Sequence, residues 1–479
     1  MNKRILIVIA AILFIGVLFQ TMVIIDYHSD GFNVGFFERN KVAETYYRSL
    51  DEVLREKYLK PFDIMVRNEG KTWILKRDED LFRNIWQDAK TIMQVTGNLE
   101  YLPESTYWGN LCIGRNGITY SLGQHFPVEY VKFLLETESL PSNVETIDKF
   151  MMIPGEEVTD IYFNTNNGVY KTQYSEQKGL LITGNFKNLV DLLTKDPYYS
   201  VNSLTDIYQF IKEEVLNKYI EPDIPVSQDV TARSIPWITI RISDDIKAYI
   251  DSLKIPGNQE REEGMAETAA VIKDKLMLLS ANTYATLFDS SDNLFFSNQF
   301  NMYEINKYGW VEYKYTPGTE GDEKGTIGEA FINAVETLGK ITVLAGDPPA
   351  ELYVSRIKDN GDSYTFSFDY RYYSKVIALE DDNHSAVITA TATRTTDARV
   401  LPLKMSEMTG EEYIGAEYRT AFLFIANLNG LYNINSIDAY NMYLGYKKTN
   451  EILEFSSPVW IIERQSGKKE TLELPRAVE

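Results

Sequence analysis

The chain has 479 residues, 44% of them hydrophobic, which is enough for more than one core at the usual domain size of about 100–200 residues. It carries 69 acidic and 48 basic side chains, and the net charge of −21 repels nucleic acid and anionic lipid headgroups, which argues against nucleic-acid binding. The single cysteine, Cys112, excludes a disulfide within the chain and a cysteine-based zinc site.

The chain begins with an apolar segment. Ile5 to Ile25 contains no charged side chain, and about 20 such residues span a bilayer as a helix. Lys3 and Arg4 precede it and Asp26 follows, so the positive-inside rule places the N-terminus in the cytoplasm and the bulk of the chain outside. A cleaved signal peptide is the alternative, but it would have a shorter apolar core of about 7–15 residues and a small-residue cleavage site. We therefore predict a retained single-pass anchor, residues 1–25, in the cell membrane.

Residues 26–225 are predicted to form an N-terminal α+β unit, because segments with helical spacing of apolar residues alternate with short strand-like runs. The predicted helices run from Asn40 to Lys60, from an N-cap at Asp78 to Gly97, from Pro127 onward, and from Ser203 to Tyr219. The predicted strands are Phe62 to Val66, Thr72 to Leu75, Ile161 to Phe163, Gly168 to Tyr174 and Leu180 to Ile182.

Residues 226–298 are predicted to be a central domain or connection. Trp237 to Leu253 has the alternation of a strand followed by the spacing of a short helix. Pro256 to Glu267 is polar and charged without an apolar period, which predicts a surface loop or linker.

Residues 299–479 are predicted to form a strand-rich domain in which a helix followed by an antiparallel meander occurs twice, as two half-repeats. The first half has a strand at Gly309 to Tyr315, a flexible loop at Thr316 to Gly325, a helix at Thr326 to Leu338, a hairpin of Leu352 to Ile357 with Tyr364 to Tyr370, and a strand at Val387 to Thr395. The second half has a helix at Tyr418 to Leu428, a strand at Tyr440 to Tyr446, and a hairpin of Val459 to Arg464 with Glu470 to Leu474. The predicted fold class is α+β, with antiparallel sheets and packed helices after the anchor.

Two short motifs match those of serine β-lactamases and penicillin-binding proteins. Ser175 to Lys178 has the spacing of the nucleophile motif, and Ser291 to Asn293 that of the second motif. That chemistry needs the serine at the start of a helix, whereas Ser175 is predicted in a polar turn between strands. The third motif occurs only in altered order, as Lys324 to Thr326. An acyl-serine enzyme is therefore the least favoured class.

Metal-binding and cofactor-binding patterns are also missing. The histidines His28, His125 and His384 lie far apart in the sequence, without partners at ligand spacing. Asp289 to Asn293 and Asp381 to Asn383 lack the spaced acidic loop of a calcium site, which predicts solvated turns. We predict no catalytic residue, no metal site and no cofactor, so the protein is expected to act by contact.

Several segments carry a family resemblance in their pattern and order. They are the basic, apolar N-terminus, Leu59 to Val66 with Trp73 to Leu75, Asp80 to Lys90, Thr286 to Asn293 leading into Trp310 to Tyr315, and Ser457 to Arg464. These segments resemble the YycH and YycI proteins, which regulate the WalK (YycG) sensor histidine kinase of Gram-positive bacteria, and their order is that of the YycH type. Residues 100–285 match only by position.

The resemblance implies a non-catalytic regulator that lies beside the kinase. Its anchor helix would contact the membrane helices of the sensor histidine kinase, its extracytoplasmic part would help set kinase activity, and a sister protein of the family is a further expected partner. Close helix pairing in lipid uses small residues, and the candidate contact residues of the anchor are Ala10, Ala11, Phe14, Gly16 and Phe19. The anchor as a plain tether stays open. So does the alternative function of a cell-surface binding domain for a peptide, glycan or small ligand.

Overall fold

The fold is described from a computed structural model. It describes residues 57–75, 77, 79–94, 96, 99–103, 108, 111, 115–140, 144–155, 157–175, 182–195, 200–203, 225–227, 234–276, 284–316, 323–346, 350–372, 375–380, 384–414, 439–449, 453–456, 458–464 and 469–473. The apolar segment predicted to be an anchor lies outside these residues, as do nearly all of the helix predicted for Asn40 to Lys60 and all of the one predicted for Tyr418 to Leu428. Within the described residues, no helix has both the length and the apolar character to cross a membrane.

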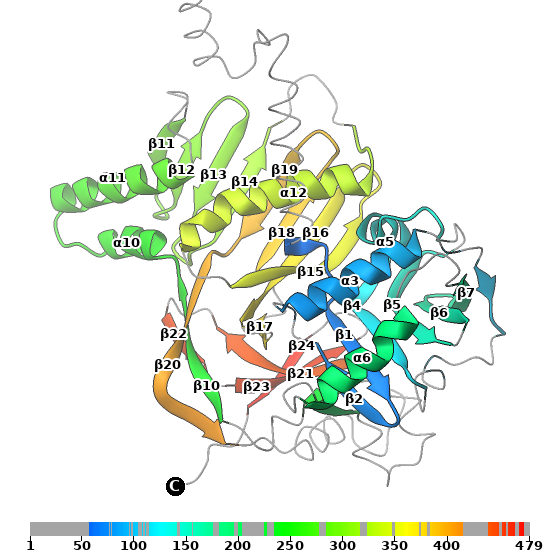
Figure 1. Cartoon of the computed structure of the whole chain (residues 1–479). Coiled ribbons are helices and arrows are strands. Elements are labelled where there is room, and N and C mark those ends of the chain that lie inside the picture. Colours follow the sequence, from blue (N-terminus) through cyan, green and yellow to red (C-terminus); the bar gives the residue numbers. More distant parts are fainter. Residues whose placement is uncertain are drawn as a thin grey trace, which may run out of the picture. The chain divides into compact units, whose positions relative to one another are not determined.

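The described N-terminal part is a nine-stranded antiparallel sheet with helices (Figure 1). Its strands follow the order β3-β7-β6-β5-β4-β1-β2-β8-β9. They are β1 (Asp63–Asn68), β2 (Lys71–Ile74), β3 (Glu100–Tyr101), β4 (Gly117–Pro127), β5 (Thr146–Pro154), β6 (Val158–Thr165), β7 (Gly168–Ser175), β8 (Ser200–Ser203) and β9 (Pro225–Ser227). The helices are α3 (Asp80–Met93), α5 (Val128–Leu135) and α6 (Ile182–Lys195).

The predicted hairpin near residue 70 is confirmed by the pairing of β1 with β2. Asn68 pairs with Lys71, and the two residues between them, Glu69 and Gly70, have φ of 50° and 77°. Positive φ at both central positions is the requirement of a type I′ turn, whose twist matches that of the strands. Glycine at the second position meets this requirement without steric cost.

The helix predicted after Asp78 is confirmed as α3, whose extended cap residue is Glu79. Its buried side chains recur at helical spacing: Phe82, Ile85, Trp86, Ala89, Ile92 and Met93. The ring of Trp86 lies 6.0 Å from that of Tyr120 on β4 and 6.3 Å from that of Phe150 on β5. The apolar stripe of α3 therefore packs on the middle of the sheet.

Two predictions in this region are wrong at the residues that the structure describes. Leu180 to Ile182 was expected to be a strand, but Ile182 begins helix α6, because a short apolar run does not distinguish a strand from the start of a helix. Ser203, expected to begin a helix, instead ends strand β8. The rest of that predicted helix lies outside the described residues.

The central section contains β10 (Ser234–Ile242), α10 (Asp244–Ser252) and α11 (Asn258–Lys275). The strand and short helix are confirmed, but the loop predicted for Pro256 to Glu267 is wrong, because most of it is the first half of α11. This helix buries only Met265, Ala269 and Ile272 among its 18 residues. So narrow a stripe gives almost no hydrophobic period, while residues of high helix propensity such as Glu, Ala, Lys and Arg fill the exposed positions.

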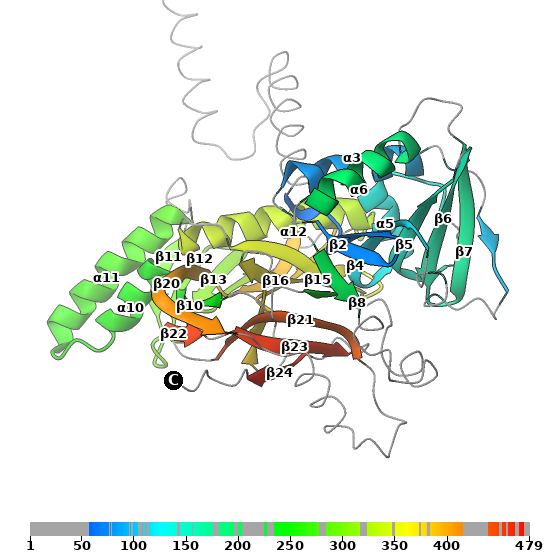
Figure 2. The same ribbon diagram turned by 60° about the horizontal axis from the view of Figure 1, so that its bottom comes forward.

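The C-terminal part is built on a larger sheet with the strand order β11-β12-β13-β14-β19-β18-β16-β17-β21-β23-β24, to which β15 adds by pairing with β16. Among the described pairings of this sheet, only β17 with β21 is parallel. The strands are β11 (Ala285–Phe288), β12 (Leu294–Ser297), β13 (Asn301–Ile305), β14 (Val311–Tyr315), β15 (Glu351–Asp359), β16 (Tyr364–Tyr372), β17 (Lys375–Leu379), β18 (Ala386–Ala390), β19 (Thr395–Val400), β21 (Ala439–Lys448), β23 (Pro458–Arg464) and β24 (Lys469–Glu473). Figure 2 shows β21, β23 and β24 side by side.

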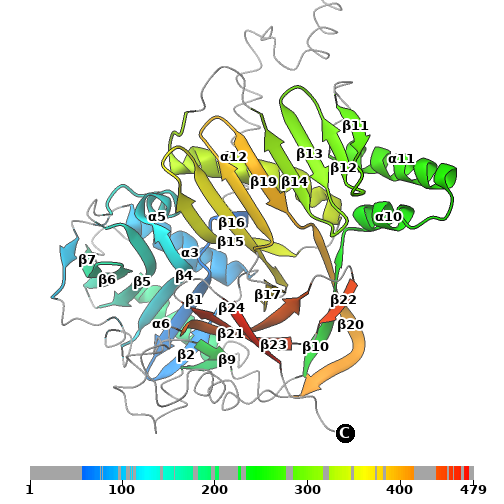
Figure 3. The same ribbon diagram turned by 180° about the vertical axis from the view of Figure 1, so that it is seen from behind.

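Helix α12 (Ile327–Thr342) begins with a capping box formed by Thr326 and Glu329, close to the predicted start. It packs on β16, β18 and β19, and Figure 3 shows these strands from the side opposite the helix. The ring of Phe331 lies 5.4 Å from that of Phe366 on β16 and 5.6 Å from that of Tyr130 on α5. One helix thus packs against the larger sheet and against a helix of the N-terminal part.

Pairing between distant segments joins the central and C-terminal sections. In a third sheet, β10 lies between β20 (Leu403–Ile414) and β22 (Leu453–Ser456). The strand predicted for Val387 to Thr395 is two strands, because Thr391 and Arg394 close a tight turn between β18 and β19. The predicted hairpins of β15 with β16 and of β23 with β24 are confirmed. The predicted boundaries at 225/226 and 298/299 stay predictions.

Candidate functional site

A buried ionic cluster lies where β16, β24 and the residues before β18 meet. Asp369 on β16 is 2% exposed, and one of its carboxylate oxygens lies 2.5 Å from Lys469 Nζ of β24. The same carboxylate lies 3.2 Å from Nδ1 of His384 and accepts the backbone N–H of Ser385 at 3.2 Å. Burial alone would raise the pKa of Asp369, but the charge of Lys469 and the hydrogen bond with His384 outweigh it and hold that pKa well below its usual range.

A second buried carboxylate, that of Glu463, has its pKa shifted in the opposite direction. Glu463 on β23 is 4% exposed and accepts hydrogen bonds from Gln124 of β4 at 2.6 Å and from the Tyr443 hydroxyl at 3.2 Å. Burial raises the pKa of Glu463 above its ordinary value, although Lys469 opposes the shift. The two carboxylates thus differ because Asp369 has the direct ion pair and Glu463 does not.

A third set of buried polar contacts joins β1 to the larger sheet. Arg371 Nη1 donates to the carbonyl oxygen of Phe62 at 2.8 Å, and Arg371 Nη2 lies 3.3 Å from Asp63 Oδ1. Beside it, Arg77 Nε donates to Glu351 Oε1 at 2.7 Å. The first of these ion pairs holds the start of β1 against β16, and the second holds Arg77, which follows β2, against the start of β15.

Ser355, His384 and Asp369 come together in a way that resembles a catalytic triad in composition only. Ser355 is the extra residue at a bulge of β15, and its Oγ lies 3.1 Å from His384 Nδ1. Asp369 contacts that same nitrogen. A working triad needs the acid on one ring nitrogen and the serine on the other. Ser355 is also only 5% exposed, so this geometry does not support nucleophilic catalysis.

Of the two β-lactamase-like motifs, the structure describes Ser175 of the first and the whole of the second, while Glu176 to Lys178 lie outside the described residues. Ser175 is the last residue of β7 and pairs with Val158. Ser291 and Asn293 lie in the turn between β11 and β12, where Asp289 Oδ1 accepts both of their backbone N–H groups at 2.9 and 2.8 Å. Lys324 is bound to Asp359 at 2.7 Å. None of these residues contacts another in the manner of an acyl-serine site.

The predicted site residues of the anchor lie outside the described residues: Ala10, Ala11, Phe14, Gly16 and Phe19. So do His28, Cys112 and the turn Asp381 to Asn383. His125 lies on β4 with its side chain exposed, and His384 lies in the buried cluster. In the part of the chain that is described, no group of three or more His, Cys, Asp or Glu side chains is arranged to hold a metal ion.

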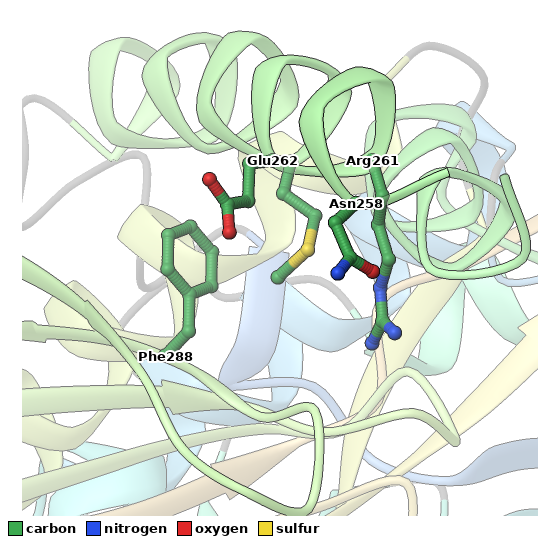
Figure 4. A pocket seen from close by; sticks show the side chains of 5 residues that line it. Asn258, Arg261, Glu262 and Phe288 are labelled. Atoms are coloured by element: carbon green, nitrogen blue, oxygen red, sulfur yellow. The ribbon is translucent and has the colours of Figure 1, made fainter. Parts of the chain in front are cut away.

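An open pocket of about 480 Å³ lies between helix α11 and strand β11 (Figure 4). Its lining residues are Asn258, Arg261, Glu262, Met265 and Phe288. The ring of Phe288 stacks on that of Tyr249 at 6.4 Å, and Arg261 forms an ion pair with Asp292 in the following turn. The pocket therefore combines an apolar wall with one cation and one anion.

A solved structure resembles the fold of this chain over most of its length. It is the crystal structure of YycH from Bacillus subtilis, with a TM-score of 0.52 and 10% sequence identity, covering 87% of this chain and 96% of that one. The chain has a YycH-type fold. No family model matches the chain, and no curated protein matches it in sequence. The YycH-type fold confirms the predicted resemblance as a likeness of fold. At 10% sequence identity, the pattern and order of the elements were the signals that carried this prediction.

The buried clusters of this YycH-type fold were missed in the sequence. Asp369 and Arg371 alternate with Phe366, Phe368 and Tyr370 on β16, which usually indicates a strand with one face in solvent. Here both faces of β16 are buried from Phe366 to Tyr372. Charged residues inside an otherwise aromatic strand were the available signal, but Lys469 lies 100 residues from Asp369, so the partner could not be inferred.

Proposed function

We propose that the chain is a non-catalytic, membrane-anchored regulator of a two-component sensor histidine kinase. The observation that carries the proposal is the YycH-type fold, which extends over 87% of this chain. The apolar segment Ile5 to Ile25 and the order of the YycH-like segments in the sequence support it as well. The proposed location is the cell membrane, with the N-terminus in the cytoplasm and most of the chain outside.

Regulation by contact requires that the protein bind one state of the kinase more tightly than the other. A partner that binds both states equally changes neither population, however tightly it binds. The proposed contacts are of two kinds: the anchor helix against the kinase's own membrane helices, and the extracytoplasmic part against the kinase or a sister protein of the same fold. Small residues in the anchor, such as Ala10, Ala11 and Gly16, would permit close helix packing.

In-membrane crosslinking tests the anchor contact directly. A photoreactive amino acid is placed at each position from Ile5 to Ile25 in living cells, and the captured protein is identified by mass. We expect a sensor histidine kinase to be captured from positions three and four apart, because these lie on one face of a helix. Positions on the opposite face serve as matched controls. Failure to capture a kinase at any position would contradict the anchor contact.

A domain exchange separates the two proposed contacts. The segment Ile5 to Ile25 is replaced by an unrelated single-pass helix of the same length, while the rest of the chain is kept. We expect phosphorylation of the cognate response regulator to change towards the value of a deletion strain, and the extracytoplasmic part to remain folded and exported. Phosphorylation at the unaltered level in both the exchanged and the deleted strains would contradict regulation of the kinase.

A further inference from the structure

Strand β11 forms the outer end of the larger sheet among the described strands, and it is unusually exposed. All of Ala285 to Phe288 are exposed, with Leu287 at 54% and Phe288 at 40%. Proteins usually protect such an edge with a lysine, a proline or a bulge. The sequence Ala-Thr-Leu-Phe has none of these features, so among the described strands this edge is open to another strand.

The pairing of β11 with β12 determines which backbone groups point outward. Asp289 donates its N–H to the carbonyl oxygen of Asn293 at 3.1 Å, which closes the hairpin. Bonded and non-bonded residues alternate along an antiparallel pair. Leu287 and Ala285 therefore bond to β12, while Thr286 and Phe288 direct their N–H and C=O groups away from the sheet. Outward backbone groups of this kind are satisfied by an extended polypeptide.

The pocket beside this edge can receive one side chain of such a polypeptide. Phe288 and Met265 form its apolar wall, and Figure 4 shows the ring of Phe288 opposite the side chains of α11. Arg261 lines the same pocket and forms an ion pair with Asp292.

The charges around the pocket specify the partner's chemistry. The first half of α11 carries three acidic side chains, Glu260, Glu262 and Glu263, and only Arg261 as a basic one. Asp289 adds a further carboxylate at the end of β11. A basic segment is attracted to this surface. A second copy of this surface is not favoured, because its acidic side chains outnumber Arg261 and would face those of the first copy.

We propose that the β11 edge and the α11–β11 pocket bind an extended segment of a partner polypeptide, in which basic and apolar side chains alternate. The segment adds to the sheet as a further antiparallel or parallel strand beside β11. One apolar side chain enters the pocket between Met265 and Phe288, and basic side chains lie near Glu262. The residues of this surface are not those of the proposed anchor contact, so the inference does not depend on the identity of the kinase.

Peptide binding to the full-length protein in lipid nanodiscs tests the inference. The probe is a positional-scanning library of acetylated octapeptides. We expect the retained peptides to alternate Lys or Arg with Val, Ile, Leu or Phe. The best peptide is then measured by fluorescence anisotropy, together with a copy N-methylated at alternate residues, which cannot add as a strand. The N-methylated copy is expected to bind at least tenfold more weakly.

Three variants locate the site. Thr286→Pro removes an outward N–H from an edge strand, a position where proline is tolerated, and should weaken binding at least tenfold. Glu262→Lys should weaken it at least fivefold, whereas the matched Glu267→Lys, an exposed charge on the same helix outside the pocket lining, should change it less than twofold.

Other outcomes would overturn the inference. These are no retained peptide, equal binding of the N-methylated copy, or equal binding by Thr286→Pro. Loss of a dimer in Thr286→Pro, detected by light scattering, would instead assign the edge to a second copy of the chain. Crosslinking from the anchor does not enter this assay, so failure of this proposal leaves the proposed kinase contact unaffected.

Discussion

Arg371 and Phe62 are 309 residues apart in sequence and form a two-part contact in the core. The guanidinium carbon of Arg371 lies 3.8 Å from the centroid of the Phe62 ring, and its Nη1 donates to the Phe62 carbonyl oxygen at 2.8 Å. One side chain of β16 thus binds both the ring and the backbone of the residue that precedes β1. The contact joins the N-terminal sheet to the C-terminal one through a cation–π interaction and a hydrogen bond.

Replacing Arg371 by alanine should therefore destabilise the protein strongly. It breaks a buried ion pair with Asp63 and leaves the Phe62 carbonyl oxygen without a donor. We expect a loss of about 3 kcal/mol in the free energy of unfolding, at the lower end for a broken buried pair. The loss lies at this lower end because the Asp63 side chain is 28% exposed, so solvent partly screens the ion pair. Chemical denaturation of the purified protein measures it.

Arg399 provides a matched control for that variant. Its guanidinium lies 4.1 Å from the ring centroid of Trp310, but its side chain is 45% exposed. Arg399→Ala is expected to lose only about 0.5–1 kcal/mol, as for an exposed cation–π contact. Equal losses for the two variants would show that burial of Arg371 contributes nothing.

Asp369 should make the protein more stable at neutral pH than in acid. Its pKa is held below the ordinary value of 3.8, so the unfolded chain binds a proton more readily than the folded one. The resulting stability is present above pH 3.8 and is lost as the pH falls through the folded value. Asp369→Asn should therefore lower the melting temperature more at pH 7 than near pH 2.5. Equal decreases at both pH values would contradict the proposed charge pairing.

Glu463 should show the opposite dependence. Burial raises its pKa above 4.5, so the folded state binds the proton more readily than the unfolded chain. The free energy of unfolding therefore rises as the pH falls from above the folded pKa towards 4.5. Glu463→Gln keeps hydrogen-bonding groups for Gln124 and Tyr443 while removing the charge. We expect this variant to be more stable than the parent at pH 8, with the gain lost near pH 4. A destabilised variant at pH 8 would show that the charge of Glu463 is favourable.

Two glycines of α12 should respond in opposite directions to alanine. A Cβ at Gly328 would lie 2.7 Å from the Phe133 ring of α5, so Gly328→Ala should lose about 1–3 kcal/mol through overpacking. Gly339 has no neighbour within 4 Å of such a Cβ, so Gly339→Ala should gain about 0.5–1 kcal/mol from helix propensity. Thermal unfolding of both variants measures the difference. Stabilisation by Gly328→Ala would show that α5 and α12 do not pack closely in solution.

A fluorophosphonate probe tests the remaining enzyme alternative. Ser355 is buried and shares one ring nitrogen of His384 with Asp369, and Ser175 ends a strand. Neither arrangement activates a serine, so the intact protein should remain unlabelled. Labelling that is lost in Ser355→Ala or Ser175→Ala would identify an active serine and contradict the non-catalytic function.

Local signals in the sequence were sufficient for elements that depend on neighbouring residues. Asn68-Glu-Gly70 predicted the turn between β1 and β2, and Thr326 with Glu329 begins α12 within one residue of the expected start. Turn and cap chemistry acts over three or four residues, so the sequence records it directly. The prediction of a loop at the start of α11 failed because this helix buries only three residues. Its sequence therefore shows almost no repeat of apolar residues at helical spacing.

The candidate sites depended on tertiary structure. The sequence by itself determined the acidic charge, the apolar character of Ile5 to Ile25 and the element order that resembles YycH. Only the folded chain brings Lys469 to Asp369, Arg371 to Phe62 and α11 to the open edge of β11. Strand order and the burial of a strand's second face are set by long-range packing, and a single sequence contains no local trace of either.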